Sequence, residues 1–419
     1  MNPDATASLK RPLKRVKQRL SHTHLSRDVS RSPVPLVKSR SGRLDAIIVP
    51  ASRPASFLQP AIDLAASLGT RLVVLCSRQT RVEQVAKRVA NTPGAKSLII
   101  PIPEGWTDSR FPSRTADSLF GNAKAGRVSD LSVKRNLGLL VARLHGWNKI
   151  AFVDDDITLS RTDNIARLAG QLDAHQVAGM VVPRHPDNSV VCHARRLAGW
   201  SQDVFVTGAV LGVHCNSLPL SFFPDIYNED WFFFAKEAAT RSLPHVGMAR
   251  QLEYNPFATP GRARREEFGD VLAEGLYALF GEASPSMSFE EQLGGATRGY
   301  WDRFIAARRD VLTETRTALG RIANQDPEDD RLSSAFYALG AAMSQLDDTV
   351  DPDLCVSFLD AYQEDLGNWQ KFTNGVNNVG STSEAMDFLQ LKMWRLAEFG
   401  AAEVDVLRGS RRLTSPAGV

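Results

Sequence analysis

The feature that most constrains the fold is a short apolar run that ends in three consecutive carboxylates. Residues 150–153 are apolar and predict a buried strand, and Asp154, Asp155 and Asp156 follow without a break. Burying unpaired carboxylates is costly, so a sheet that directs them at its own end requires a cation there. Because residues two apart on an extended chain project to the same side, Asp154 and Asp156 are predicted to face one ion, with Asp155 pointing elsewhere.

A small number of hard oxygen ligands suits magnesium or manganese, which keep open positions for phosphate oxygens. The acidic triplet therefore predicts a divalent metal ion, manganese or magnesium, and a substrate that carries a diphosphate. The alternative interpretation is structural: the carboxylates cap the helix predicted from residue 162, or they lie in a solvated turn.

Strands and helices alternate before this run. The predicted strands are 44–49, 71–76 and 97–100, and the predicted helices between them are 56–68 and 81–90. This alternation predicts an α/β fold with a mostly parallel sheet covered on both faces. A further helix over 129–145 leads into the acidic strand. Ligands of such sheets bind beyond the carboxyl ends of the strands, which is where the aspartates fall.

The pattern becomes mixed after residue 160 and then almost wholly helical. We expect strands at 177–182, 190–193 and 204–206, and helices at 162–172, 228–240, 262–280, 288–323, 329–347, 352–370 and 382–408. The chain is therefore predicted to divide into three parts. These are a basic, disordered tail (1–43), an α/β domain (44–284) and an α-helical C-terminal appendage (285–419).

Composition indicates a globular protein of the cytoplasm. Hydrophobic residues make up 43% of the chain and charged residues 23%. No apolar run approaches the roughly 20 residues of a membrane span, and the N-terminus lacks the apolar core of a secretory signal. The four cysteines form no Cys-x-x-Cys pair, which argues against a zinc site or a disulfide framework and fits a reducing cytosol.

Positive charge is concentrated at the N-terminus, where residues 1–43 contain eleven Lys or Arg against two Asp, although the whole chain carries only +3. We interpret this segment as a solvated tail; the alternative is peripheral contact with anionic lipid. No aromatic residues interleave the basic ones and no nucleic-acid reader motif is present, so nucleic acid is not an expected partner.

Five segments occur in a fixed order along the chain. They are Pro50-Ala-Ser-Arg-Pro54, Lys134-Arg-Asn-Leu-Gly138, Phe152-Val-Asp-Asp-Asp156, Thr207-Gly-Ala209 and Asn228-Glu-Asp-Trp231. Together they resemble the GT-A-fold nucleotide-sugar glycosyltransferases, in particular the family 2 type, over residues 44–260. The resemblance implies a Rossmann-like domain that binds a nucleoside-diphosphate sugar and a hydroxyl-bearing acceptor.

The resemblance also implies catalytic roles. Asp154 and Asp156 match the motif that holds a divalent metal and the donor's diphosphate. Asp230 matches the general base of inverting members, which takes the proton of the acceptor hydroxyl, and Glu229 is the alternative base or its support. The competing interpretation is that Asn228, Glu229 and Asp230 simply make a favourable helix start.

Further donor contacts are implied around these carboxylates. The positions that match donor-binding segments are Pro50, Ala51, Ser52, Arg53, Lys134, Arg135, Asn136 and Asp155. Arg262 lies in a basic loop that could close over the diphosphate or could be a solvated helix start. His245 sits where some relatives have a third metal ligand, although a lone histidine is more often structural. Ser77 and Arg78 replace the acidic residue with which many relatives read the base, so the nucleobase is left open.

The leading hypothesis is a metal-dependent transferase of a single sugar, because the Gln-x-x-Arg-Trp motif of processive synthases is absent. Inversion with Asp230 as base is expected, and a retaining enzyme with a phosphoglycerate-type acceptor is a close variant. A nucleotidyltransferase is disfavoured because residues 50–54 contain no glycine. A non-catalytic nucleotide-sugar-binding protein is the remaining alternative.

Overall fold

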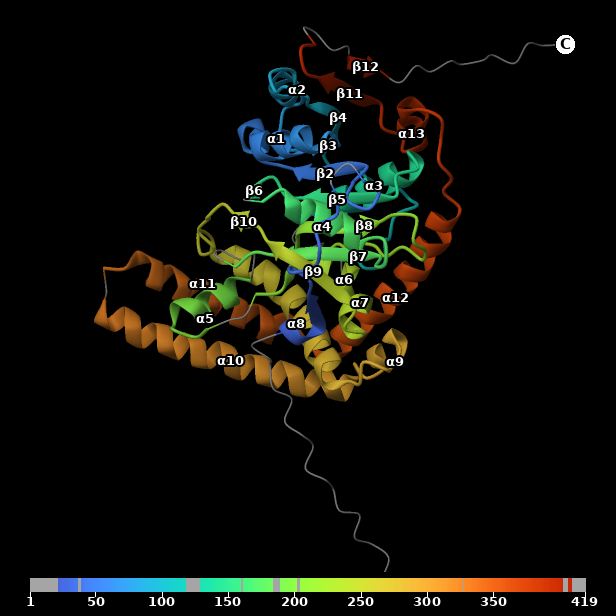
Figure 1. The fold of residues 1–419 in the computed structure, drawn as a ribbon. Coiled ribbons are helices and arrows are strands. Elements are labelled where there is room, and N and C mark those ends of the chain that lie inside the picture. The colour runs from blue at the N-terminus through green and yellow to red at the C-terminus, as the bar shows by residue number, and fades with distance from the viewer. Residues whose placement is uncertain are drawn as a thin grey trace, which may run out of the picture.

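The computed structural model describes residues 22–36, 39–117, 129–159, 161–183, 189–201, 204–326 and 328–401, and the backbone of 406–408. Over these residues ten strands form one sheet (Figure 1), in the spatial order β1 (Ser26–Asp28), β9 (Leu243–Met248), β7 (Val177–Val181), β8 (Val206–His214), β5 (Lys149–Val153), β2 (Ala46–Ala51), β3 (Arg71–Cys76), β4 (Lys96–Pro101), β11 (Met393–Glu398) and β12 (Val406–Arg408). A two-stranded sheet pairs β6 (Ile157–Thr158) with β10 (Arg250–Gln251).

The sheet is mixed, with two parallel blocks. Strands β5, β2, β3 and β4 run parallel to one another, and so do β1, β9 and β7. Strand β8 is antiparallel to both of its neighbours and joins the two blocks. The predicted α/β fold is thus confirmed at the level of a layered sheet with a parallel core, and the antiparallel β8 and β11 were not expected.

Helices cover both faces because alternate residues of the central strands are apolar on each side. In β2, Ile48 enters one hydrophobic core, whereas Ile47 and Val49 enter a second core on the opposite face. The helices next to these strands are α1 (Gln59–Leu68), α2 (Val82–Ala90), α3 (Leu131–Leu144) and α4 (Asp163–Gln171). Because β2, β3 and β5 run parallel, their carboxyl ends share one edge of the sheet.

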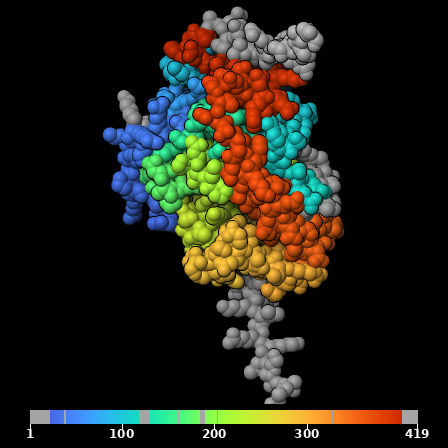
Figure 2. All heavy atoms as spheres, turned by 90° about the vertical axis from the view of Figure 1, so that its right-hand side faces the viewer, coloured from blue at the N-terminus to red at the C-terminus, as the bar shows by residue number. Residues whose placement is uncertain are grey.

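Most of the remaining helices come from the second half of the chain. They are α6 (Glu229–Phe233), α7 (Ala235–Ala239), α8 (Pro260–Glu282), α9 (Phe289–Leu293), α10 (Arg298–Gln325), α11 (Asp330–Thr349), α12 (Pro352–Asn374) and α13 (Thr382–Phe388); η1 (Thr23–Leu25), η2 (Ala55–Leu58) and α5 (Val190–Leu197) come before them. Of these, α8, α10, α11 and α12 form a helical bundle. Helices α8, α10 and α11 pack together beside the β9 end of the sheet. From there, α12 and the segment after it run along the molecule to the opposite edge (Figure 2).

Two predicted elements are wrong. Residues 190–193, predicted as a strand, begin helix α5, because the Ser189 hydroxyl accepts a hydrogen bond from the Cys192 N–H and caps a helix there. Residues 382–408, predicted as one helix, form α13 and then strands β11 and β12. Strand β11 pairs antiparallel with β4, so an available sheet edge outweighs the local helical pattern.

Several boundaries also differ from expectation. The helix predicted at 288–323 is divided into α9 and α10, and the one predicted at 228–240 into α6 and α7. The strand expected at 204–206 continues to His214 as β8. The folded part begins before residue 44, because Leu25 is fully buried and Ser26–Asp28 pairs with β9 at the sheet edge. Residues 1–21 of the predicted basic tail lie outside the described residues. Among the helices that are described, none has both the length and the apolar surface needed to cross a bilayer.

Candidate active site

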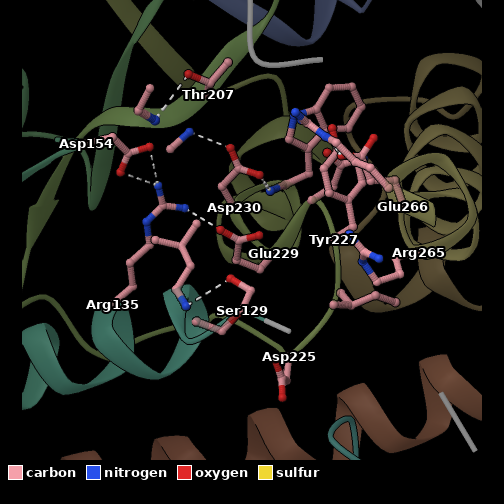
Figure 3. Close-up of a pocket in the computed structure, with 18 of the residues that line it drawn as sticks. Ser129, Arg135, Asp154, Thr207, Asp225, Tyr227, Glu229, Asp230, Arg265 and Glu266 are labelled. Carbon is pink, nitrogen blue, oxygen red and sulfur yellow. Dashed lines mark hydrogen bonds and ion pairs between the residues drawn. The ribbon is translucent and has the colours of Figure 1, made fainter. Parts of the chain in front are cut away.

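Two adjoining hollows lie at the carboxyl ends of β2, β3 and β5. The larger, about 470 Å³, is lined by Thr207, Asn228 and Asp230 among others, and we call it the Asp230 hollow (Figure 3). The smaller, about 360 Å³, is lined by Ser52, Lys134 and the aspartates 154–156, and we call it the triplet hollow. Both are bordered by Arg53, Asp154 and Arg262, so they form one continuous site.

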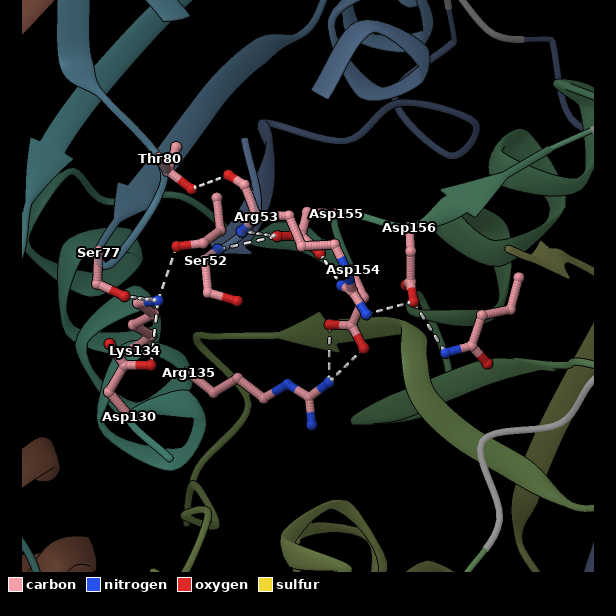
Figure 4. Close-up of polar contacts among 12 residues, drawn as sticks. Ser52, Arg53, Ser77, Thr80, Asp130, Lys134, Arg135, Asp154, Asp155 and Asp156 are labelled. Atoms are coloured by element: carbon pink, nitrogen blue, oxygen red, sulfur yellow. Dashed lines mark hydrogen bonds and ion pairs between the residues drawn. The ribbon is translucent and has the colours of Figure 1, made fainter. Parts of the chain in front are cut away.

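Asp155 anchors the loop that follows the first central strand. Its Oδ2 accepts hydrogen bonds from the backbone N–H of Ser52 (2.8 Å) and of Arg53 (3.0 Å), and its Oδ1 pairs with the Arg53 guanidinium (Figure 4). Asp155 is buried. Its carboxylate therefore holds the backbone of the 50–54 loop in place.

Asp154 and Asp156 are each engaged by a guanidinium group. Arg135 Nη2 donates to both carboxylate oxygens of Asp154, at 2.9 and 3.1 Å. Arg53 Nη2 lies 2.8 Å from Asp156 Oδ2, and Gln251 Nε2 donates to the same oxygen at 3.1 Å. Both aspartates border the triplet hollow. The two arginines thus balance the charge of the acidic turn.

Lys134 ties three elements together at the edge of the triplet hollow. Its Nζ donates to the Ala51 carbonyl (2.8 Å) and the Ser77 hydroxyl (2.6 Å), and it lies 3.2 Å from Asp130 Oδ1. Burial lowers the pKa of Lys134, and the Asp130 carboxylate opposes this effect. The ends of β2 and β3 and the start of α3 are therefore held by one buried ammonium group.

Arg135 is the central cation of the Asp230 hollow. It bridges Asp154 and Glu229, with Nη1 2.5 Å from Glu229 Oε1. Burial lowers the pKa of Arg135, but the carboxylates of Asp154 and Glu229 outweigh burial and raise it above its usual value. Gly208 makes room for this side chain, because a Cβ at that position would lie 2.5 Å from Arg135 Nη1.

The two neighbouring carboxylates at the start of α6 have different surroundings. Glu229 is 8% exposed and faces Arg135; burial raises the pKa of its carboxyl, while the guanidinium lowers it. Asp230 lines the hollow and accepts backbone N–H bonds from Gly208 (2.5 Å) and Trp231 (2.9 Å). Both carboxylates line the hollow, but Glu229 is buried and Asp230 half-buried, so Asp230 is the more accessible of the pair.

The remaining predicted residues divide between the site and its surroundings. Arg262, at the start of α8, borders both hollows; its Nε lies 2.5 Å from Glu266 Oε1 and its Nη2 donates to the Tyr254 hydroxyl at 3.2 Å. Pro50 lines the triplet hollow. Asn136 does not reach either hollow, because both ends of its amide bond to the Phe223 backbone at 2.8 Å.

His245 is not brought to the acidic turn. It lies on β9, where its Nε2 is 3.6 Å from Asp28 Oδ1 of the edge strand, and it lines neither hollow. The expected third metal ligand is therefore corrected: this histidine lies beside the edge strand β1, away from the acidic turn. Within the described ranges, no cluster of three His, Cys, Asp or Glu side chains suited to a metal ion is present.

Five residues of the triplet hollow were not singled out from the sequence: Ser129, Asp130, Leu131, Gln251 and Tyr254. Asp130 immediately precedes helix α3, so its place at a helix start was a usable signal. Gln251 and Tyr254 are brought in by the β6–β10 pairing and the segment after it. No local pattern marks them.

Comparison with known proteins adds little to this geometry. No protein-family model matches the chain, and no curated protein matches it. Among solved structures, one similar chain is the mannosyltransferase PcManGT from Pyrobaculum calidifontis in complex with GDP-Man and Mn2+. It is 15% identical, with a TM-score of 0.41, over 76% of this chain and 91% of that chain.

Proposed function

We propose that this protein is a metal-dependent glycosyltransferase of the GT-A type that moves one sugar from a nucleoside-diphosphate sugar to a hydroxyl acceptor. The supporting observation is the convergence, in one continuous hollow, of the acidic turn, the cations Arg53 and Arg262, and the carboxylate of Asp230. A diphosphate needs cations, and the acceptor hydroxyl needs a nearby base. This site contains both.

The donor set of the acidic turn suits a hard divalent cation. Mg²⁺ and Mn²⁺ need only one or two carboxylates when phosphate oxygens and waters complete the shell. Asp154 and Asp156 would supply those carboxylates, and Arg53, whose side chain is 40% exposed, would turn away from Asp156. When bound, such an ion neutralises the charge that develops on the departing nucleoside diphosphate.

The chain's own residues then act on the acceptor. Two backbone N–H groups hold Asp230 at the hollow, where its carboxylate takes the proton of the acceptor hydroxyl. The acceptor oxygen forms a bond to the anomeric carbon as the bond from that carbon to the diphosphate oxygen breaks. The electron pair of the broken bond leaves with the nucleoside diphosphate. Arg262 and Arg53 bind and orient the phosphates.

Two alternatives make different predictions about Asp230. A retaining enzyme with a phosphoglycerate-type acceptor does not use Asp230 as base, so Asp230→Asn would spare much of its activity. In a non-catalytic binding protein, the same site would bind a nucleotide sugar without turning it over. Arg265, which lines the Asp230 hollow, is the observation that favours an anionic acceptor.

The first test is a thermal-shift titration with UDP, GDP, ADP and dTDP, each with manganese, magnesium or EDTA. Stabilisation by one nucleotide, lost in EDTA and in Asp156→Ala, supports the proposal and identifies the base of the donor. Absence of a shift with every nucleotide and metal pair contradicts it. The matched control is Asp45→Asn, which alters a carboxylate at the amino end of β5, on the opposite edge of the sheet.

A further inference from the structure

The short helix α6, which carries Glu229 and Asp230, is held from behind by the helical bundle. The Tyr277 hydroxyl of α8 donates to the Trp231 carbonyl at 2.8 Å, and the Tyr362 hydroxyl of α12 donates to the Phe232 carbonyl at 2.9 Å. A five-residue helix makes few hydrogen bonds of its own, so these contacts add support from outside it.

The start of α6 has an unusual backbone. Asn228, immediately before Glu229, is in the left-handed conformation, with φ 64° and ψ 34°. This conformation is unfavourable for residues other than glycine, and asparagine tolerates it only with local support. Here the support comes from outside the turn, because Asn228 Nδ2 donates to Asp270 Oδ1 of α8 at 3.2 Å.

Asp270 is itself fixed by a buried ionic cluster. Arg308 of α10 donates to Asp270 Oδ2 at 2.6 Å and to both carboxylate oxygens of Glu267 at 2.8 Å. The side chains of Arg308 and Glu267 are completely buried, and that of Asp270 is 3% exposed. Two carboxylates converge on one buried guanidinium, so turning Asp270 away would take one of its partners from Arg308.

Close approach of α8 to the turn depends on Gly269. A Cβ at that position would lie 2.4 Å from the Tyr227 carbonyl oxygen, which is backbone and cannot move aside easily. Glycine next to Asp270 therefore lets the helix lie directly against the 227–228 segment. The line of contacts runs from Arg308 through Asp270 and Asn228 to the carboxylates of the hollow.

We propose that Asp270, locked by Arg308, is a positioning residue that fixes the left-handed turn at Asn228 and so directs Asp230 toward the hollow. This role rests on the proposed function, since Asp230 is the base there. It also gives α8 and α10 a role in the site, because Asp270 and Arg308 lie on these two helices and act on the turn that carries Glu229 and Asp230.

The test uses the full chain and compares Asp270→Asn, Asn228→Gly and the double variant. Asp270→Asn leaves Arg308 paired with Glu267, so the cluster stays balanced and the variant folds. Its amide directs the oxygen at Arg308 and its NH₂ group toward Asn228, which removes the bond from the Asn228 NH₂ group to a carboxylate oxygen. Asn228→Gly permits the left-handed backbone without the side-chain contact.

The first readout is amide hydrogen exchange at Gly208 and Trp231, whose backbone N–H groups donate hydrogen bonds to the Asp230 carboxylate. We expect exchange there to rise roughly tenfold in Asp270→Asn if the carboxylate is no longer held in place, with little change in Asp45→Asn. The second readout is kcat for release of nucleoside diphosphate with water as acceptor. The donor is UDP-glucose, GDP-mannose, ADP-glucose or dTDP-glucose, whichever carries the base that the thermal shift identifies. We expect kcat to fall roughly 10- to 100-fold, with the donor KM unchanged.

Because Asp270 is proposed to act through Asn228, the double variant should match Asn228→Gly in both readouts. Unchanged exchange in Asp270→Asn, or additive losses in the double variant, would overturn the positioning role. Failure of the proposed function would look different. In that case the wild-type protein itself would bind no nucleotide, whatever the variants do.

Discussion

At the scale of single residues, the acidic turn shows how a sequence motif and its tertiary setting combine. Three consecutive aspartates after a buried strand indicate that a cation is needed, and the structure satisfies them with Arg53, Arg135 and backbone N–H groups. The counter-ions come from positions 53 and 135, which no local pattern assigns to these carboxylates. The sequence therefore predicts the negative charge of the acidic turn, but not which cations pair with each aspartate.

Arg53 is expected to compete with a metal ion for Asp156. In Arg53→Met, the affinity for Mn²⁺ alone should rise roughly five- to tenfold. The reason is that removing a competing unit charge beside the carboxylates is worth on the order of 1 kcal/mol. Electron paramagnetic resonance of free Mn²⁺ measures this. Arg88→Met, which removes an equal charge outside both hollows, is the control. Weaker Mn²⁺ binding in Arg53→Met would show that Arg53 supports the metal instead.

The cysteines are expected to be unreactive in the native protein. All four are buried, and burial raises the pKa of the Cys76 thiol to about 12 and those of Cys215 and Cys355 above their usual values. The reactive thiolate is therefore scarce at pH 8. A chromogenic disulfide reagent should release no thiol product until denaturant is added, and then report four thiols per chain. Rapid labelling of any one in the native state would contradict this burial.

At the scale of elements, some helix glycines lie at a close contact with another segment, and others lie on open surface. A Cβ at Gly269 of α8 would meet the Tyr227 carbonyl, whereas a Cβ at Gly367 of α12 would have nothing within 4 Å. The helical pattern alone predicts the same effect for both, because alanine favours helices over glycine by about 1 kcal/mol. Only the packing separates them.

We therefore expect opposite effects of the same substitution. Gly269→Ala should lower the free energy of unfolding by about 1–3 kcal/mol through overpacking, and Gly367→Ala should raise it by up to ~1 kcal/mol. Urea unfolding followed by circular dichroism measures both. Stabilisation by Gly269→Ala would mean that α8 can move away from the 227–228 segment without cost.

Elements differ in how well their sequences predict them. The strands 71–76 and the helices near 262–280 and 352–370 are present because their apolar spacing matches one burial pattern. Residues 393–398 have no such spacing of their own and become a strand only because β4 offers an unpaired edge. Long-range pairing of this kind has no local signal.

At the scale of the whole molecule, the bundle and the sheet are joined by buried polar contacts. Trp369 Nε1 of α12 donates to the Ser221 carbonyl at 2.9 Å, and Arg143 of α3 donates to the Val376 carbonyl at 3.0 Å. The division at residue 284 remains a prediction. If these contacts couple the two parts, they unfold together.

Calorimetry tests this coupling. The full chain should melt in one cooperative transition, and a chain of residues 44–284 should aggregate, because it leaves the bundle-facing side of α8 and the Phe232 region uncovered. Two separate transitions, with one of them retained by the 44–284 chain, would establish an independent helical appendage instead.

The sequence by itself determined the α/β layering and the acidic end of β5, because both depend on short-range apolar patterning. It also placed Asp230 at a helix start beside the predicted site. Tertiary structure alone decided that Arg135 bridges Asp154 and Glu229, that His245 pairs with Asp28 of the edge strand, and that Asp270 bonds to Asn228. These contacts join residues far apart in the chain, and their geometry follows from packing, which one sequence does not encode locally.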